Sequence, residues 1–314
     1  MCGIAGFYQS DQNYLSAGYH GTSPENPWRK RLIAMRQSLR SRGPNDENTL
    51  LFHHAGLAHT RLAIRDILGG KQPMSAQYRG RGASIVYNGE IYNTCELREE
   101  LKPFGMSWST TGDTEVILNG FLAMGTSFFE KLNGIFAFAI YVHQTKELYL
   151  VRDSLGVKPL FYSFDHTAVV FGSEPKALFA YGIHPAADRA CWNEIFSLGP
   201  ARTLGNGGFA GIHELLPGEY MHISASGCRH HFFRKLEAVP HHDSYTDTIR
   251  HVRFLLCDSI HRQMVSDIPI CSFLSGGLDS SLVTAICQMY LKKEDAALDT
   301  FSFDFKGNDV NFKA

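Results

Sequence analysis

The segment "MCGIAGFY" at residues 1–8 places a cysteine directly after the initiator methionine. Chain termini usually fray, so a thiol there has little core to join. Methionine removal is favoured before a small residue, and Cys2 would then carry both a thiol and the free α-amino group. Because an α-amine titrates near ~7.7–8.0, it accepts protons at neutral pH. The pattern therefore predicts a residue with its own nucleophile and base; the alternative is a small apolar residue opening a strand.

Helices and strands downstream of this segment predict layered sheets. Leu32, Met35 and Leu39 recur at helical spacing within residues 27–42, and Gly43-Pro44 ends that pattern. A second helical pattern covers residues 111–125, with Asp113 as its expected N-cap. Short apolar runs joined by turn residues predict strands at 134–142, 147–153, 158–164 and 168–174. Helices flanking consecutive strands with short connections are typical of an α+β fold.

Composition excludes several classes of protein. The chain has 314 residues, a formal net charge of -1 and 44% hydrophobic residues. A near-neutral balance argues against a nucleic-acid partner, and no apolar run is long enough to span a membrane. Seven scattered cysteines without a C-x-x-C pair predict reduced thiols in a cytoplasmic protein. Histidine pairs at 230–231 and 241–242 are expected in a solvated linker and not at a metal.

The pattern changes towards the carboxyl end of the chain. We expect a first domain at 1–225, a polar linker at 226–245 and a second domain from 246 to 314. Ile249, Val252, Leu256, Ile260 and Met264 form one helix face, followed by an apolar strand, a glycine loop and a second helix. The alternating residues 298–305 predict another strand. This order begins a doubly wound α/β domain, and the chain stops before that domain would be complete.

Ordered motifs in the first domain resemble class II glutamine amidotransferases, the N-terminal-nucleophile glutaminases. After "MCGIAGFY" come "LRSRGPND" (39–46), "HTRLAI" (59–64), "NGEIYN" (88–93) and "TGDTEVIL" (111–118). The resemblance covers most of residues 1–220 and implies an αββα sandwich, with "NGEIYN" typical of the asparagine synthetase branch.

This resemblance implies a glutamine pocket around Cys2. Arg61 would bind the substrate carboxylate through its planar fork, and Glu90 and Asp113 would neutralise the ammonium. Asn88 and the backbone N–H of Gly89 would hold the oxyanion formed when Cys2 attacks the amide. Simpler alternatives exist: a surface ion pair for Arg61, a helix cap for Asp113 and a hairpin turn at Asn88-Gly89.

A glycine loop in the second domain, "FLSGGLDSS" (273–281), lies between an expected strand and helix. It lacks the Walker A lysine and resembles the pyrophosphate loop of ATP pyrophosphatases. The resemblance implies ATP as co-substrate, with Mg²⁺ held in part by Asp279, and no tightly bound cofactor for glutamine hydrolysis. The expected phosphate-binding residues are Leu274, Ser275, Gly276, Gly277, Asp279, Ser280 and Ser281.

The two motif sets in this order resemble the glutamine-hydrolysing asparagine synthetase family. That resemblance implies glutamine, ATP and aspartate as substrates, aspartyl-AMP as the amidated intermediate, and a possible homodimer. A later acidic loop of the family does not follow Asp304, so the synthetase site is expected to be incomplete. Two alternatives stay open: a different carboxylate acceptor, or a truncated chain that binds glutamine or a partner without catalysis.

Overall fold

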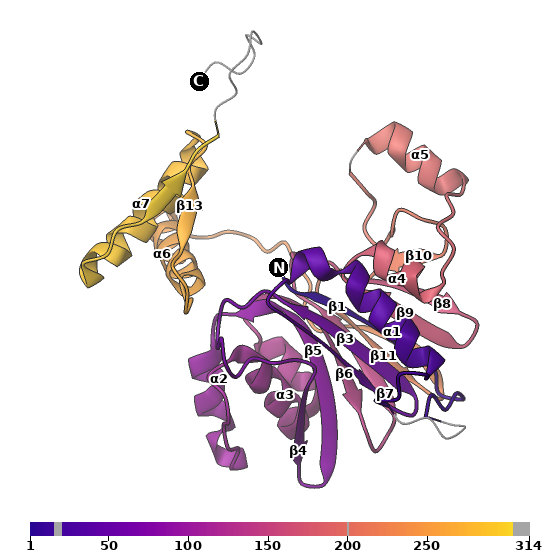
Figure 1. Cartoon of the computed structure of the whole chain (residues 1–314). Coiled ribbons are helices and arrows are strands. Elements are labelled where there is room, and N and C mark those ends of the chain that lie inside the picture. The colour runs from indigo at the N-terminus through magenta and orange to yellow at the C-terminus, as the bar shows by residue number, and fades with distance from the viewer. Residues whose placement is uncertain (16–20, 200, 304–314) are drawn as a thin grey trace. The chain divides into compact units, whose positions relative to one another are not determined.

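The computed structural model describes residues 1–15, 21–199 and 201–303 of the chain (Figure 1). The chain divides into two units, Met1–Leu236 and Glu237–Ala314. No helix in these described ranges is long and apolar enough to cross a membrane.

Two six-stranded sheets form the centre of the first unit. Their strand orders are β10-β8-β9-β1-β3-β2 and β12-β11-β7-β6-β5-β4, and the pairings between neighbouring strands are antiparallel. The strands of the first sheet are β1 (Gly3–Tyr8), β2 (Asp46–Leu51), β3 (Ala55–Arg61), β8 (Phe161–Asp165), β9 (Ala168–Gly172) and β10 (Ile212–Glu214). Those of the second are β4 (Met74–Tyr78), β5 (Arg81–Ile91), β6 (Gly134–Val142), β7 (Glu147–Arg152), β11 (Glu219–Ser224) and β12 (Gly227–Phe232).

Helices cover the outer faces of both sheets (Figure 1). Leu32 and Met35 of α1 pack with Phe7 on one side, and Val116 and Phe121 of α3 pack with strands β5 and β6 on the other. The expected αββα sandwich is therefore confirmed. The helices of this unit are α1 (Pro27–Ser38), α2 (Thr94–Leu101), α3 (Asp113–Met124), α4 (Pro175–Tyr181) and α5 (Arg189–Leu198).

Alternation along β1 and β5 determines which side chains meet between the sheets. Ile4 of β1 and Val86 of β5 belong to the inter-sheet core. Side chains two residues apart share a face, so Cys2 lies on the Ile4 side and Asn88 and Glu90 lie on the Val86 side. The sandwich thus points three of the expected site residues into one space.

His59 ties the two sheets together beside this space. Its Nε2 lies 3.1 Å from the carbonyl oxygen of Tyr87, so β3 of one sheet is linked to β5 of the other. Burial lowers the pKa of His59 to about 4, so the imidazole is neutral at neutral pH and donates this hydrogen bond from Nε2. His59 is a structural residue of the sandwich.

Two expectations for local structure need correction. The helix expected over 27–42 ends at Ser38, and Arg40–Arg42 form a separate 3₁₀ turn. Residues 227–232, expected in a linker, form β12 and pair with β11. The polar composition of β12 misled the prediction because an edge strand pairs on one side only and tolerates polar side chains.

The second unit contains the expected strand, loop and helix. β13 (Cys271–Phe273) and β14 (Asp299–Phe301) pair in parallel, with α7 (Leu278–Leu291) between them in sequence and α6 (Tyr245–Gln263) packed on α7. β13, α7 and β14 thus form one βαβ unit, the repeat from which doubly wound domains are built. Residues 304–305 of the expected strand 298–305 lie outside the described residues.

Candidate active site

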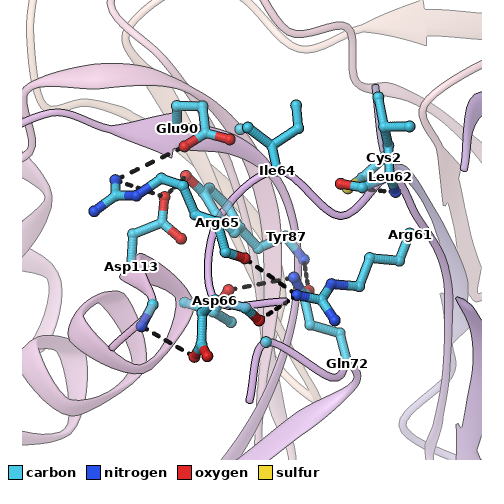
Figure 2. A pocket seen from close by; sticks show the side chains of 14 residues that line it. Cys2, Arg61, Leu62, Ile64, Arg65, Asp66, Gln72, Tyr87, Glu90 and Asp113 are labelled. Atoms are coloured by element: carbon cyan, nitrogen blue, oxygen red, sulfur yellow. Dashed lines mark hydrogen bonds and ion pairs between the residues drawn. The ribbon is translucent and has the colours of Figure 1, made fainter. Parts of the chain in front are cut away.

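A pocket at one end of the sandwich gathers five of the six expected glutamine-site residues. Its lining includes Cys2, Arg61, Gly89, Glu90 and Asp113 (Figure 2). The cavity volume is about 30 Å³, room for about two waters. A ligand of amino-acid size would therefore need the open mouth of the pocket, or a shift of a side chain such as Ile64, which lies between Cys2 and Glu90 in Figure 2.

Cys2 is held at the start of β1 by main-chain contacts. The Leu62 N–H points at Cys2 Sγ at 3.4 Å, and Arg42 Nε donates to the Cys2 carbonyl oxygen at 2.9 Å. Burial raises the pKa of the Cys2 thiol, so a base must take its proton as it attacks. Met1 is 55% exposed and precedes the first strand residue, Gly3, so its removal costs no sheet pairing.

Asn88 and Gly89 lie inside strand β5, so the alternative of a hairpin turn is wrong. Asn88 is buried, and its Nδ2 has no hydrogen-bond partner among the described residues. A buried donor without a partner costs stability, which is the pattern expected of a group kept for a ligand.

The N–H of Gly89 faces the pocket because strand β4 does not extend far enough along β5 to pair with it. The last β4 residue in register, Met74, lies opposite Ile85. On that side, Tyr87 N–H donates to Gln72 Oε1 and Ile91 N–H donates to Asp113 Oδ2. Because N–H groups two residues apart point to the same side of a strand, the Gly89 N–H points to this side as well. A Cβ at 89 would collide with the Ile135 carbonyl and the Tyr87 ring, so only glycine fits.

Arg61 fixes the loop that forms the pocket wall. Its guanidinium donates to the carbonyls of Arg65, Asp66 and Ile67 at 3.1, 2.6 and 3.0 Å. Three of its five N–H groups are used in this way, which leaves two for a ligand. The alternative of a surface ion pair is wrong, because Arg61 is buried and bonds main-chain oxygens.

Asp113 is not the N-cap of α3; Gly112 holds that position. The Asp113 carboxylate turns into the pocket wall, where Oδ2 accepts from Tyr87 Oη at 2.8 Å and from Ile91 N–H at 3.0 Å. Glu90 lies nearby, and burial followed by the Asp113 charge raises its pKa to about 8. Two carboxylates therefore share one subsite, and burial favours the neutral form of Glu90.

Three charged residues at the site were missed by the sequence reasoning. Arg65 reaches Glu90 and Asp113, Arg42 holds Cys2 and ion-pairs with Glu174, and Lys158 is buried near Cys2 and Glu90. Burial lowers the pKa of Lys158. Arg42 lies within the motif "LRSRGPND" and Arg65 directly follows "HTRLAI". This closeness to the motifs was the sequence feature that could have indicated a place at the site.

The glycine loop in the second unit joins β13 to α7. Gly276 has φ +83°, a left-handed conformation that favours glycine, and Gly277 is the N-cap of α7. Ser275 and Ser280 hydroxyls are 2.9 Å apart, and Ser281 Oγ donates to the Gly277 carbonyl. Asp279 is exposed in the first helical turn beside Leu278, while Leu274 ends the strand side of the loop. The described residues contain no group of three metal-ligating side chains.

The model of the glutamine amidotransferase domain family matches residues 1–234. The chain belongs to the glutamine amidotransferase family. The asparagine synthase model matches residues 251–312, so both families occur in the order expected from the motifs.

Relatives and a solved structure agree with this family and fold. Asparagine synthetase [glutamine-hydrolyzing] 3 of Bacillus subtilis is 42% identical over 100% of this chain and 50% of its own length. Asparagine synthetase B of Escherichia coli is 34% identical over 83% of this chain and 42% of its own. The chain thus spans about half the length of these curated relatives. Glutamine phosphoribosylpyrophosphate amidotransferase of B. subtilis shares the fold, with a TM-score of 0.52 and 14% identity over 100% of this chain and 68% of its own.

Proposed function

We propose that the chain hydrolyses glutamine at Cys2 and supplies ammonia to an ATP-dependent synthetase that converts aspartate to asparagine. The single observation that supports the glutaminase step best is one pocket lined by a cysteine just before β1, an arginine and two carboxylates. The Asn88 amide, whose Nδ2 has no hydrogen-bond partner among the described residues, lies on the same inter-sheet face. The relatives' names support the amidation of aspartate, and this chain spans about half of their length.

The proposed hydrolysis begins with removal of Met1. The α-amine of Cys2 accepts the thiol proton as sulfur attacks the amide carbon, and the proton then passes to the departing ammonia. Asn88 Nδ2 and the Gly89 N–H donate to the oxyanion of the tetrahedral intermediate. Water cleaves the remaining thioester to glutamate and regenerates the thiol.

The charged groups of the pocket complement the two charged groups of glutamine. The free N–H groups of Arg61 bind the α-carboxylate, while Glu90 and Asp113 bind the α-ammonium. Figure 2 shows Cys2 on the Arg61 side of the pocket, across from Glu90 and Asp113. Glutamine's two charged groups thus fix the position of its amide.

The loop at 273–281 fits a pyrophosphate group. Gly276 allows the tight turn, and the unpaired N–H groups at the start of α7 point to where an anion would lie. We propose Leu274, Ser275, Gly276, Gly277, Ser280 and Ser281 as the ATP contacts and Asp279 as a Mg²⁺ contact. Mg²⁺ is commonly held by one or two carboxylates together with substrate phosphates, so a single aspartate is compatible with it.

Intact mass and affinity labelling test the proposal directly. The purified chain should lack Met1 and should gain one adduct at Cys2 from 6-diazo-5-oxo-L-norleucine, an electrophilic glutamine analogue. Excess glutamine should protect the thiol. A chain that keeps Met1 and takes no label would contradict the proposed hydrolysis.

The pH dependence of the KM for glutamine tests the role of Glu90. Because its pKa is raised to about 8, Glu90 is mostly neutral at lower pH and attracts the ammonium poorly. We expect KM to fall roughly tenfold per pH unit between about pH 6 and pH 8, the limit for loss of one proton. Steady-state kinetics of Glu90→Gln should remove this dependence, and a flat KM in the unmodified chain would refute it.

A further inference from the structure

Arg65 places a third charge between the two carboxylates of the pocket. Its Nη1 lies 3.7 Å from Glu90 Oε2 and 3.8 Å from Asp113 Oδ2. Only 12% of the Arg65 side chain is exposed, against 25% for Glu90 and 9% for Asp113. Figure 2 shows its guanidinium pointing between these two acids. Such close, poorly solvated charges interact more strongly than surface pairs do.

Arg65 is anchored independently of the acids. Its Nη1 donates to the Ile91 carbonyl at 2.9 Å and its Nη2 to Thr94 Oγ1 at 3.2 Å. The Arg61 guanidinium donates a hydrogen bond to the Arg65 carbonyl. Asp66, the next residue, accepts from the N–H of Gly112 at the start of α3. These contacts fix the guanidinium as a permanent part of the pocket wall.

Hydrogen bonding distinguishes the two acids. Asp113 Oδ2 accepts two hydrogen bonds, from Tyr87 Oη and the Ile91 N–H. Glu90 Oε2 is buried without a hydrogen-bond partner among the described residues. Hydrogen bonds to a carboxylate favour its charged form. The hydrogen bonds therefore favour the charged form of Asp113 over that of Glu90, while Arg65 lies within 4 Å of both acids and offsets one of their two charges.

Other charged groups around Glu90 do not change this assignment. Lys158, from the loop after β7, and the thiol of Cys2, just before β1, face the same space. Tyr87 stays neutral because burial raises its pKa. Lys158 also carries a lowered pKa caused by burial. Arg65 is the cation whose separation from both acids is below 4 Å.

We propose that Arg65 determines the pH dependence of the ammonium subsite: by offsetting one of the two carboxylate charges, it makes attraction of the ligand's α-ammonium depend on the ionisation of Glu90. With Glu90 protonated, the three groups sum to zero charge and hold no attraction for a cation. With Glu90 ionised, they sum to one negative charge, which a single ammonium neutralises. This inference rests on the proposed glutamine hydrolysis.

Removing Arg65 should reverse this dependence. In Arg65→Met, the hydrogen bonds from Tyr87 Oη and the Ile91 N–H still favour the charged form of Asp113. The subsite should then carry one negative charge even where Glu90 is protonated. Glutamine should then bind without releasing a proton, and its affinity should become nearly independent of pH. At low pH the variant should bind glutamine more tightly than the unmodified pocket does.

Calorimetric titration with glutamine tests this pH dependence. All variants carry Cys2→Ala, so that glutamine binds without being hydrolysed. Between about pH 6 and pH 8, the Kd of Cys2→Ala should fall roughly tenfold per unit, whereas Cys2→Ala/Arg65→Met should vary less than about threefold. Arg65→Lys should keep the steep dependence. Arg79→Met is the matched control, because it removes the same charge at an exposed position.

The outcomes separate the two proposals. An equal loss of affinity at every pH in Arg65→Met, with the slope kept, would mean a structural role and overturn this inference alone. Failure of Arg65→Lys to keep the slope would overturn it too, even if Arg65→Met failed to fold. Absence of glutamine binding in Cys2→Ala at every pH, together with no label on the unmodified chain, would overturn the proposed function and the inference with it.

Discussion

Cys2→Ala will abolish glutamine hydrolysis, with kcat falling by at least about 10³-fold, the loss typical when a nucleophile is removed. The methyl group cannot form the thioester, and no neighbouring thiol lines the pocket among the described residues. Glutamine binding should persist, because Arg61, Glu90 and Asp113 are untouched. Glutamate release measured on the purified chain, together with calorimetric binding, checks both halves of this result.

Cys95→Ala is the matched control for Cys2→Ala. Cys95 is exposed on α2 and lies outside the pocket lining, so its loss should leave kcat and KM unchanged. Glutaminase activity that survives in Cys2→Ala but falls in Cys95→Ala would refute the assignment of the nucleophile. Cys2→Ser tests the chemistry further, since a less acidic hydroxyl should slow the attack while the terminal amine stays in place.

The sandwich was predictable because its strands carry strong local signals. The predicted strands at 134–142 and 147–153 match β6 and β7 closely. Strand β12 was missed because burial of an edge strand is partial, and its polar residues resemble those of a loop. Local composition cannot distinguish the two, since pairing with β11 is a long-range property.

The site was predictable where a motif carries its own chemistry. Cys2, Arg61, Gly89, Glu90 and Asp113 do line one pocket. Asn88-Gly89 resembles a turn locally, and only the early end of β4 leaves the Gly89 N–H directed at the pocket. That arrangement depends on strands far apart in the sequence.

The position of the Arg65 side chain could not be predicted from the sequence. Nothing in its position after "HTRLAI" indicates that its side chain crosses to Glu90 and Asp113. The path is created by Arg61, which binds three consecutive carbonyls and curves the loop. Tertiary hydrogen bonds, and not local propensity, therefore position the charge of Arg65 in the subsite.

Asn88→Ala will lower kcat for glutamine hydrolysis by about 10²–10³-fold, the usual loss when one oxyanion donor is removed. KM should change little, because Nδ2 is proposed to bond the oxyanion and not the ground-state charges of glutamine. Thermal stability should also change little, since Nδ2 has no hydrogen-bond partner among the described residues and none is lost. Stopped-time assays of glutamate release and thermal unfolding measure the two quantities.

Asn93→Ala provides the contrast that makes Asn88→Ala decisive. Asn93 Nδ2 donates to the Lys131 carbonyl and its Oδ1 accepts from the Asn133 N–H, so its loss removes two hydrogen bonds outside the pocket lining. That variant should lose about 1–2 kcal/mol of stability and keep its kcat. If both variants lost stability and neither lost kcat, Asn88 would be a structural amide. A loss of kcat without a loss of stability in Asn88→Ala alone would instead identify the buried, unpartnered amide as the donor to the transition state, because such a donor bonds only when the oxyanion forms.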